Sequence, residues 1–369
     1  MRDGFAVDKW LFLAVAALAA VGVTMVLSTS YLYAQERFAD GTYFLRKQLF
    51  AMTAGLTALV VCSLVPAATY RRLAYPVLAL TFVVLVLVLI PGIGVSRGGA
   101  RRWLMLSGFA FQPAEMAKLA VVLYLAHSMA KKEEMIRTFS VGVLPHLIVA
   151  GGFLGALLLE PDFGTALILT MLLYLMLFIG GARVHHLLAT GLMALPVLIY
   201  VMLKAEYRLR RLMTFMDPWR EASSSGFQII QSLIAFGSGQ LWGRGLGESR
   251  QKLFYLPEAH TDFIYAVLCE ELGFIGGALV LALFAVYAWR GLEACFRAPD
   301  NFGRFLALGI TVMVASQALI NLGVVLGMMP TKGIPLPFMS YGGSSLFVML
   351  LGTGVLLNIS QQTGEAVRG

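Results

Sequence analysis

VLALTFVVLVLVLI, residues 77–90, contains no charged side chain, and apolar stretches like it recur along the whole chain. A helix needs about 20 predominantly apolar residues to cross the hydrocarbon core of a bilayer. A transmembrane β-strand would instead alternate apolar and polar residues over about ten positions, and this stretch does not alternate. Because only helices and closed barrels satisfy their backbone polar groups in lipid, the sequence predicts an all-α, polytopic membrane protein.

The composition of the chain supports this prediction. Hydrophobic residues make up 59% and charged residues 13% of the 369 positions, whereas soluble domains carry about a quarter charged residues. The first apolar run, residues 11–27, is longer than the hydrophobic region of a signal peptide, so we expect a retained helix. The cysteines lie in or beside predicted helices without metal-ligand spacing, which argues against a disulfide framework; they are Cys62, Cys269 and Cys295.

The apolar runs predict about ten transmembrane helices within one domain that spans residues 1–369. The predicted ranges are 9–29, 44–64, 73–91, 113–130, 141–159, 164–182, 184–203, 263–289, 304–328 and 343–360. Short loops rich in Lys and Arg remain in the cytoplasm. If both termini are cytoplasmic, the short loops on that side carry more Lys and Arg than the outer short loops, which favours this orientation. The cytoplasmic residues are then Arg71, Arg72, Lys131, Lys132, Arg137, Arg183, Arg290, Arg297 and Arg304.

Residues 204–262 form one large extracytoplasmic loop under this topology, although the other loops are short. Loops of this length are usually functional or disordered. Apolar residues between 227 and 236 predict a short amphipathic or re-entrant helix within it. The glycines that follow, at positions 237, 239, 243, 245 and 247, could form backbone N–H nests for an anion or serve as ordinary turns.

Ionisable residues gather near the predicted outer face. Such groups are costly at membrane depth and indicate function by default. A mixture of acids and bases suits an anionic substrate with a lipid tail, because Arg and Lys bind phosphate and a carboxylate can act as a base. No Walker motif is present, so direct use of ATP has no support. The group comprises Glu115, Lys118, Glu160, Asp162, Glu258, His260, Asp262, Arg101, Arg102, Arg208, Arg210, Arg211, Arg244, Arg250 and Lys252.

Asp262 closes the long loop and opens the next predicted helix. It could be a general base that removes a proton from a sugar hydroxyl. It could equally be a carboxylate that complements a helix N-terminus. His260 lies two residues earlier, where a loop histidine bonded to the backbone is favoured over a catalytic one.

Glu115 and Lys118 are three residues apart and can share one face of a helix. They could form an internal ion pair that fixes helix packing, or Lys118 could turn toward an anionic substrate. Asp162 is typical of a helix N-cap. Arg101 and Arg102 could anchor the membrane interface or contact phosphate and sugar.

Five sequence blocks in order resemble the SEDS family (shape, elongation, division and sporulation). The blocks are GGARRW with FQPAEMAK (98–103, 111–118), PDFGT (161–165), GFQ to GSG (226–239), YLPEAHTDF with EELG (255–263, 270–273) and PLPFMSYGGSS (335–345). The resemblance covers about residues 10–360. PTKG (330–333), SRQK (249–252) and GGSS (342–345) are more similar to the cell-division, FtsW-type members than to the RodA-type elongation members. Glu160 departs from the family, which more often has glutamine there.

The resemblance implies a glycosyltransferase that polymerises lipid II into β-1,4 glycan strands during septal cell-wall synthesis and releases undecaprenyl pyrophosphate. Asp262 would be the catalytic base that deprotonates the acceptor hydroxyl. Lys118 and loop arginines would stabilise the leaving pyrophosphate, with room for a divalent cation, Mg²⁺ or Mn²⁺, and no need for a nucleotide. Further substrate contacts are expected at Glu115, Arg101, Arg102, Gln231, Ser232, Glu258, His260 and Ser340.

The family also implies partners and a location. The expected partners are lipid II, a class B penicillin-binding transpeptidase, other membrane proteins of the division machinery and membrane lipid, with no nucleic acid. The expected location is the bacterial cytoplasmic (inner) membrane at the division septum. The rival functions are a lipid II flippase and a non-enzymatic division scaffold. A flippase should carry polar residues through the bilayer, whereas the ionisable residues here cluster at one face.

Overall fold

The computed structural model describes residues 8–97, 99–106, 109–204, 206–222, 224, 226–252 and 256–366. All ten predicted helices are present, with modest changes in their ends. They are α1 (Lys9–Phe38), α2 (Tyr43–Leu64), α3 (Ala67–Leu89), α4 (Pro113–Lys131), α5 (Leu144–Leu159), α6 (Phe163–Ile179), α7 (Val184–Leu203), α10 (Ile264–Arg297), α11 (Asn301–Val325) and α12 (Gly343–Ala366). The segment 204–262 contributes α8 (Glu206–Met216), a 3-10 turn (Pro218–Glu221) and α9 (Phe227–Gly239).

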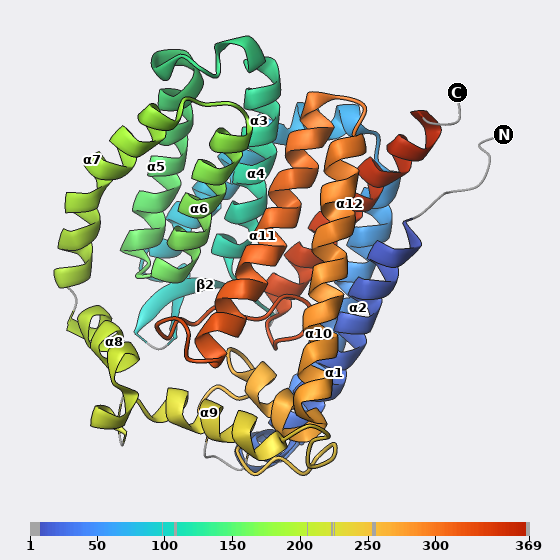
Figure 1. Cartoon of the computed structure of the whole chain (residues 1–369), viewed down its shortest axis with the longest axis vertical. Coiled ribbons are helices and arrows are strands. Elements are labelled where there is room, and N and C mark those ends of the chain that lie inside the picture. The colour runs from blue at the N-terminus through green and yellow to red at the C-terminus, as the bar shows by residue number, and fades with distance from the viewer. Residues whose placement is uncertain are drawn as a thin grey trace.

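Ten helices lie side by side as a membrane-embedded bundle (Figure 1). Eight of the described helices are long and apolar enough to cross a bilayer, if α5 is counted with the π-turn Phe139–Val143 that leads into it. α6 is equally apolar but has 17 residues. α4 has 19 residues and contains Glu115 and Lys118. The chain is therefore a multi-pass membrane protein.

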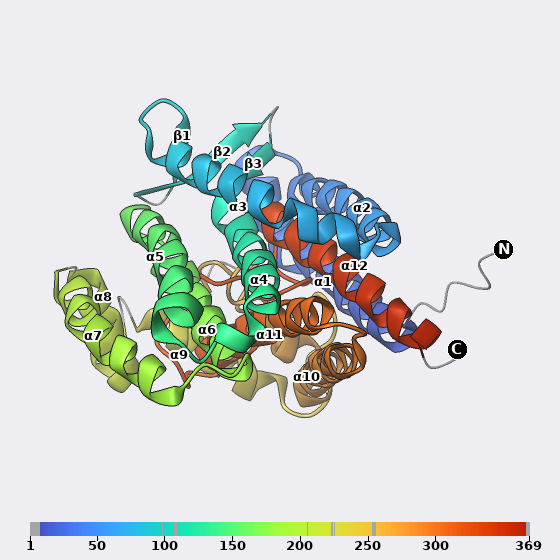
Figure 2. The same cartoon turned by 90° about the horizontal axis from the view of Figure 1, so that it is seen from above.

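α11 is the central helix of the bundle, and α7 stands at its edge (Figure 2). The apolar window of α11 is 83% buried, whereas that of α7 is 6% buried. Small residues allow the close packing, as expected where helices associate in lipid: a Cβ added to Gly309 of α11 would lie 2.4 Å from Val122 Cγ1 of α4. α7 therefore presents most of its apolar surface to lipid.

α10 is broken at Gly273, whose φ of 69° and ψ of −170° interrupt the helix. The chain after α9 fills the break. The amides of Arg244 and Gly245 donate to the carbonyls of Glu270 and Glu271, both at 3.0 Å. A Cβ added to Gly243 would lie 2.1 Å from the Glu271 carbonyl oxygen. This part of the glycine-rich segment thus allows close backbone approach. Of the two alternatives left open by the sequence, the structure excludes the anion nest for these two amides, because both already donate to helix carbonyls.

A small antiparallel sheet that the sequence did not predict follows α3. Its strands are β1 (Gly94–Arg97), β2 (Ala100–Leu106) and β3 (Phe109–Phe111), in the order β1-β2-β3. The sheet lies at the end of the bundle that also carries α8 and α9, whereas the beginning of α1 and the end of α12 lie toward the opposite end (Figure 1). The sheet therefore carries Arg101 and Arg102 to the end of the bundle where the loop 204–262 folds.

Candidate active site

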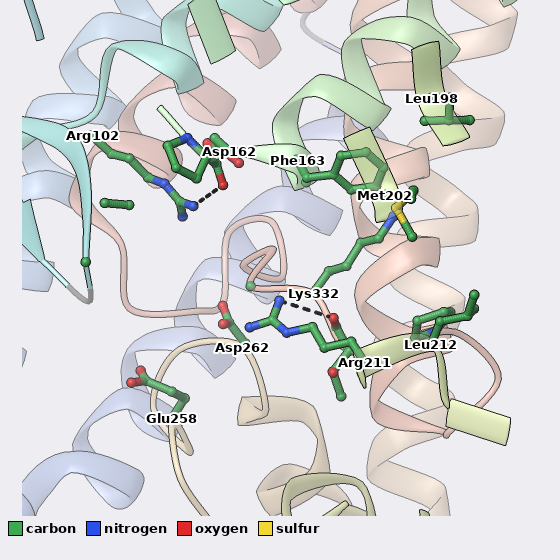
Figure 3. Close-up of a pocket in the computed structure, with 17 residues that line it drawn as sticks. Arg102, Asp162, Phe163, Leu198, Met202, Arg211, Leu212, Glu258, Asp262 and Lys332 are labelled. Atoms are coloured by element: carbon green, nitrogen blue, oxygen red, sulfur yellow. Dashed lines mark hydrogen bonds between the residues drawn. The ribbon is translucent and has the colours of Figure 1, made fainter. Parts of the chain in front are cut away.

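A cavity of about 810 Å³ opens at this end of the bundle. Its walls come from β2, the α5–α6 turn, α7, α8, the segment before α10 and the α11–α12 loop (Figure 3). Leu198, Met202 and Leu212 make one side apolar. The charged lining residues are Arg102, Asp162, Arg211, Glu258, Asp262 and Lys332. The cavity therefore joins an apolar wall to charges of both signs, which suits an amphipathic anionic ligand.

The carboxylate of Asp262 is the best candidate for a base in this cavity. Its pKa is raised to about 7, chiefly by burial and in part by the like charge of Glu258, while Arg211 opposes the shift. The side chain keeps some accessible surface because it lines the cavity, yet protein surrounds it and desolvation dominates. A carboxylate whose pKa lies near neutral pH can both accept and release a proton under working conditions.

The alternative role of Asp262 as a helix cap has little support. The N-cap position of α10 is Phe263, and α10 has no side-chain capping hydrogen bond. Within the described part of the chain, no group donates a hydrogen bond to the Asp262 carboxylate. Gly333 packs against it instead: a Cβ there would lie 3.0 Å from Asp262 Oδ2. The carboxylate is therefore held by packing and open to a substrate hydroxyl.

Two cations share the cavity with Asp262. The Arg211 guanidinium lies near the Asp262 carboxylate, whereas the Lys332 ammonium extends away from it toward Phe163 and Met202 (Figure 3). Arg211 of α8 donates to the Thr331 carbonyl at 3.4 Å. Lys332 Nζ lies 5.0 Å from the centroid of the Phe163 ring. The pKa of Lys332 is lowered to about 8, chiefly by burial and in part by the positive charge of Arg211. Two cations that repel each other in a partly desolvated cavity favour a bound anion.

Sequence reasoning missed Lys332 as a site residue. It appeared only inside the PTKG block at residues 330–333. That block was the available signal, since it places a basic residue beside a glycine in a loop that shares a face with Asp262.

Arg102 and Asp162 form the opposite wall of the cavity. Arg102 Nε donates to the Glu160 carbonyl at 3.1 Å, and its guanidinium also donates to the Pro161 carbonyl. Asp162 caps α6, because its carboxylate accepts from the Thr165 amide at 3.1 Å. The predicted N-cap is confirmed, and the same side chain also lines the cavity.

Glu160 is fully buried, and neither of its carboxylate oxygens has a hydrogen-bond partner among the described residues. Its pKa is raised to about 8, chiefly by burial and in part by the negative charge of Asp162, while Arg102 opposes the shift. Glu160 is therefore protonated at neutral pH and resembles a glutamine in charge.

The structure places Glu115 and Lys118 inside the bundle and not on the cavity wall. They form a buried ion pair at 2.9 Å, and Lys118 Nζ donates to Gln317 Oε1 of α11 at 2.5 Å. Lys118 is 1% exposed. This arrangement matches the packing interpretation of the pair and gives Lys118 no direct route to a ligand in the cavity.

Several other predicted substrate contacts also lie away from the cavity. Ser232 Oγ donates to the Val325 carbonyl at 2.7 Å and joins α9 to α11. Gln231 is half-buried on α9, and Arg101 is exposed on β2.

The remaining two predicted contacts, His260 and Ser340, support the backbone behind Asp262. Ser340 Oγ donates to the Thr261 carbonyl at 2.6 Å. The ring of His260 packs against Tyr33 and Phe44, with ring centroids 5.6 and 4.9 Å apart. Of the substrate contacts predicted from the sequence, Arg102 and Glu258 line the cavity.

The described residues contain no group of three His, Cys, Asp or Glu side chains placed to hold a metal ion. Glu258 and Asp262 are nevertheless two carboxylates on one cavity wall. Mg²⁺ is commonly bound by one or two carboxylates together with substrate phosphates. If Asp262 acts as the base, Glu258 is the carboxylate left to hold a divalent cation that arrives with a phosphorylated substrate, so the described residues fit an open site completed by substrate phosphates and not a closed protein site.

Comparison with known proteins places these features in a family. The family model described as "Cell cycle protein", which covers FtsW, RodA and SpoVE, matches residues 9–365. The chain is 47% identical to a probable peptidoglycan glycosyltransferase FtsW of Trichlorobacter lovleyi, over 96% of this chain and 93% of that protein. It is 44% identical to the stage V sporulation protein E of Bacillus subtilis, over 96% of this chain and 97% of that protein.

Two solved structures have similar folds. A chain of a peptidoglycan synthase complex, solved to describe the coordination of polymerization and crosslinking, superimposes with a TM-score of 0.78 at 28% identity, and the match covers 98% of this chain and 99% of that one. The rod shape determining protein RodA of Thermus thermophilus gives a TM-score of 0.72 at 29% identity, with coverage of 98% and 99%.

Proposed function

The chain belongs to the cell cycle protein family of FtsW, RodA and SpoVE, and on this premise we propose that it is a peptidoglycan glycosyltransferase. It polymerises lipid II into β-1,4 glycan strands during septal cell-wall synthesis and releases undecaprenyl pyrophosphate. The observation that carries the proposal is the Asp262 carboxylate, with a pKa raised to about 7, in a cavity whose other walls provide cations and apolar surface.

The cavity supports the binding of a lipid-linked sugar pyrophosphate. Arg211 and Lys332 lie on one wall and Arg102 on another, so negative charge can be held on more than one side of Asp262. Leu198 and Met202 of α7 extend the cavity along an apolar helix that is itself exposed to lipid. A substrate with an anionic head and a polyprenyl tail fits this division of polar and apolar surface.

The reaction follows from this placement. Asp262 accepts the proton of the 4-hydroxyl of the acceptor sugar. The freed oxygen forms a bond to the anomeric carbon of the donor while the bond from that carbon to the pyrophosphate oxygen breaks. The electron pair leaves with undecaprenyl pyrophosphate, and the anomeric configuration inverts.

Arg211 and Lys332 stabilise the negative charge that develops on the leaving group. A divalent cation held by Glu258 with the substrate phosphates would add charge neutralisation when bound, and it would leave the Asp262 carboxylate free to accept the proton. No nucleotide takes part in the proposed reaction, because the lipid pyrophosphate already activates the donor.

A transpeptidase partner and a location complete the proposal. The similar chain in a peptidoglycan synthase complex supports partnership with a class B penicillin-binding transpeptidase, alongside other division membrane proteins. We infer insertion in the bacterial cytoplasmic membrane at the septum, with both termini in the cytoplasm. The site would then face outward, because it lies at the end of the bundle opposite to the beginning of α1 and the end of α12.

The direct test is glycan synthesis by the purified protein with its transpeptidase partner. Wild type, Asp262→Asn and the control Asp217→Asn receive lipid II in detergent, and the products are separated on a gel. Asp217 is an exposed carboxylate on the same face that caps a short turn outside the cavity. We expect polymer from wild type and control and none from folded Asp262→Asn. Equal polymer from Asp262→Asn would remove Asp262 as the base. No polymer from any of the three would favour the flippase, which a translocation assay in liposomes then tests.

A further inference from the structure

Three consecutive carbonyls that end at Asp262 are each held by a different donor. The Tyr341 amide donates to the His260 carbonyl at 3.0 Å. Ser340 Oγ donates to the Thr261 carbonyl at 2.6 Å, and Asn321 Nδ2 donates to the Asp262 carbonyl at 2.8 Å. All three donors come from α11 or from the loop between α11 and α12. We refer to these three hydrogen bonds as the carbonyl clamp.

Asn321 is the member of the clamp that bonds to Asp262 itself. It lies on α11, is 2% exposed, and does not line the cavity. Its amide nitrogen also donates to the Ile334 carbonyl at 2.8 Å. Both partners are carbonyl oxygens, which only accept, so the orientation of the amide is determined by its bonds. Asn321 Oδ1 is buried and has no hydrogen-bond partner in the described chain.

The second bond of Asn321 matters because Ile334 follows Gly333. Gly333 packs on the Asp262 carboxylate, where an added Cβ would lie 3.0 Å from Oδ2. The side-chain amide of Asn321 therefore joins the backbone of Asp262 to the loop that packs on the Asp262 side chain. It thereby sets the position of the Asp262 carboxylate relative to this loop, which also contains Lys332.

One helical turn before Asn321, a second side chain on the same face of α11 also supports the α11–α12 loop. Gln317 precedes Asn321 by four residues, so both side chains lie on one side of the helix. Gln317 Nε2 donates to the Pro335 carbonyl at 3.0 Å, and its Oε1 accepts from Lys118 at 2.5 Å. Lys118 is held in turn by Glu115 at 2.9 Å. The buried ion pair of α4 thus anchors the loop that packs on Asp262.

We propose that Asn321 is a positioning residue for Asp262, which it holds through backbone carbonyls, and that the Gln317–Lys118–Glu115 chain supports the same loop. The proposal rests on the proposed function, in which Asp262 is the base. It assigns Lys118 an indirect role, through the loop and not through contact with substrate. A displacement of about 1 Å of a reacting group can cost about 100-fold in rate.

The test compares Asn321→Leu, which keeps the branched shape and the number of side-chain heavy atoms but removes both hydrogen bonds of the amide, with the control Thr311→Val. Thr311 is buried on the same helix, and its hydroxyl donates within that helix to the Ala307 carbonyl. For Asn321→Leu we expect kcat to fall about 100-fold with KM within about twofold, because Asn321 does not line the cavity. We also expect the acid limb of the pH–rate profile to move to lower pH, since a loosened Asp262 regains water while Glu258, Arg211 and Lys332 remain. Thr311→Val should match wild type in all three readouts.

A second readout does not depend on catalysis. Hydrogen–deuterium exchange of the amides in residues 258–266 should accelerate in Asn321→Leu and not in Thr311→Val. Should Asn321→Leu fail to fold, Ser340→Ala leaves Asn321 in place and removes the bond from Ser340 Oγ to the Thr261 carbonyl, together with the bond that Ser340 Oγ accepts from the Leu336 amide at 2.8 Å. It should shift kcat, the acid limb and the exchange in the same directions. A kcat within twofold of wild type with unchanged exchange would overturn the proposal. An inactive wild type would defeat the proposed function instead, and the exchange data would still test the clamp.

Discussion

The pH dependence of polymerisation is the most direct consequence of the environment of Asp262. Its pKa is raised from 3.8 to about 7, chiefly by burial. A general base is active when deprotonated, so the rate should rise with pH through this pKa. With a pKa near 7, about one-tenth of the carboxylate is ionised at pH 6 and about nine-tenths at pH 8, which predicts an increase of about tenfold. An ordinary aspartate would be ionised at both values and give no increase.

The assay is kcat/KM for glycan synthesis by the purified complex, obtained from initial rates at lipid II concentrations well below KM between about pH 5.5 and 8.5, because kcat/KM reports the pKa of the enzyme without bound substrate. Samples returned from each extreme to pH 7 must recover full activity, which separates titration from inactivation. Glu258→Gln should move the acid limb to lower pH, because Glu258 raises the pKa of Asp262. Arg211→Gln should move it to higher pH, because Arg211 lowers that pKa. A flat profile between pH 6 and 8, or shifts of the opposite sign in the two variants, would refute the reasoning.

Three further predictions concern packing around the site. Glu160→Gln should stabilise the protein, because the Glu160 carboxyl loses its proton at a lower pH in the unfolded state than in the folded state. This stabilisation should be absent near pH 4, grow as the pH rises from 4.5 to about 8, and then stay constant at a few kcal/mol. Melting temperatures of the variant and wild type in detergent at pH 5 and pH 9 check this. Gly333→Ala should lower kcat about tenfold or more without unfolding the protein, because its Cβ would lie 3.0 Å from Asp262 Oδ2; normal kinetics would exclude that contact. Lys118→Met should destabilise the protein by about 3–5 kcal/mol by leaving Glu115 buried without its partner, and adding Glu115→Gln should recover most of the loss in a thermal unfolding assay.

The helices could be predicted from the sequence because membrane thickness restricts their length. The helix predicted at residues 44–64 corresponds to α2 (Tyr43–Leu64), and its ends agree within one residue. The main errors are extensions: α1 runs to Phe38 beyond the predicted 9–29, and α10 runs to Arg297 beyond 263–289. Hydropathy reports the part of a helix that lies in lipid. A helix that continues past the interface keeps its backbone hydrogen bonds while its composition becomes polar.

The site could be predicted only in part, because its geometry comes from segments far apart in the chain. The order of the sequence blocks identified Asp262 and placed it on the same face as Arg102 and Glu258. It could not show that Lys332 lies on the wall of the same cavity, or that Asn321 holds the Asp262 backbone. Those relations depend on how the α11–α12 loop folds back over the segment before α10, which no local periodicity encodes.

The glycine-rich segment after α9 is a second case in which a local sequence pattern could not reveal the tertiary contacts. Glycines in a loop are compatible with an anion nest when the loop is considered alone. The break in α10 at Gly273 exposes helix carbonyls, and the amides of Arg244 and Gly245 are used to satisfy them. A buried backbone group must be paired, so the loop and the broken helix complete each other's hydrogen bonds.

The buried charges of the bundle bear on the choice between polymerisation and translocation. The fully buried charged side chains of the described membrane helices are Glu115, Lys118, Glu270 and Glu271. Each of these side chains has a partner. Glu115 pairs with Lys118, and Glu271 pairs with Lys252 at 2.9 Å. Glu270 accepts hydrogen bonds from the hydroxyls of Ser249 and Ser238 and from the Arg250 amide. A pyrophosphate that crossed the bilayer through the bundle would have to displace these partners, at the cost of leaving buried charges unpaired. The charges that line the cavity lie instead at one end of the bundle, around a carboxylate suited to accept a proton. This distribution supports chemistry on a substrate held at the membrane surface over passage of its head group between the helices.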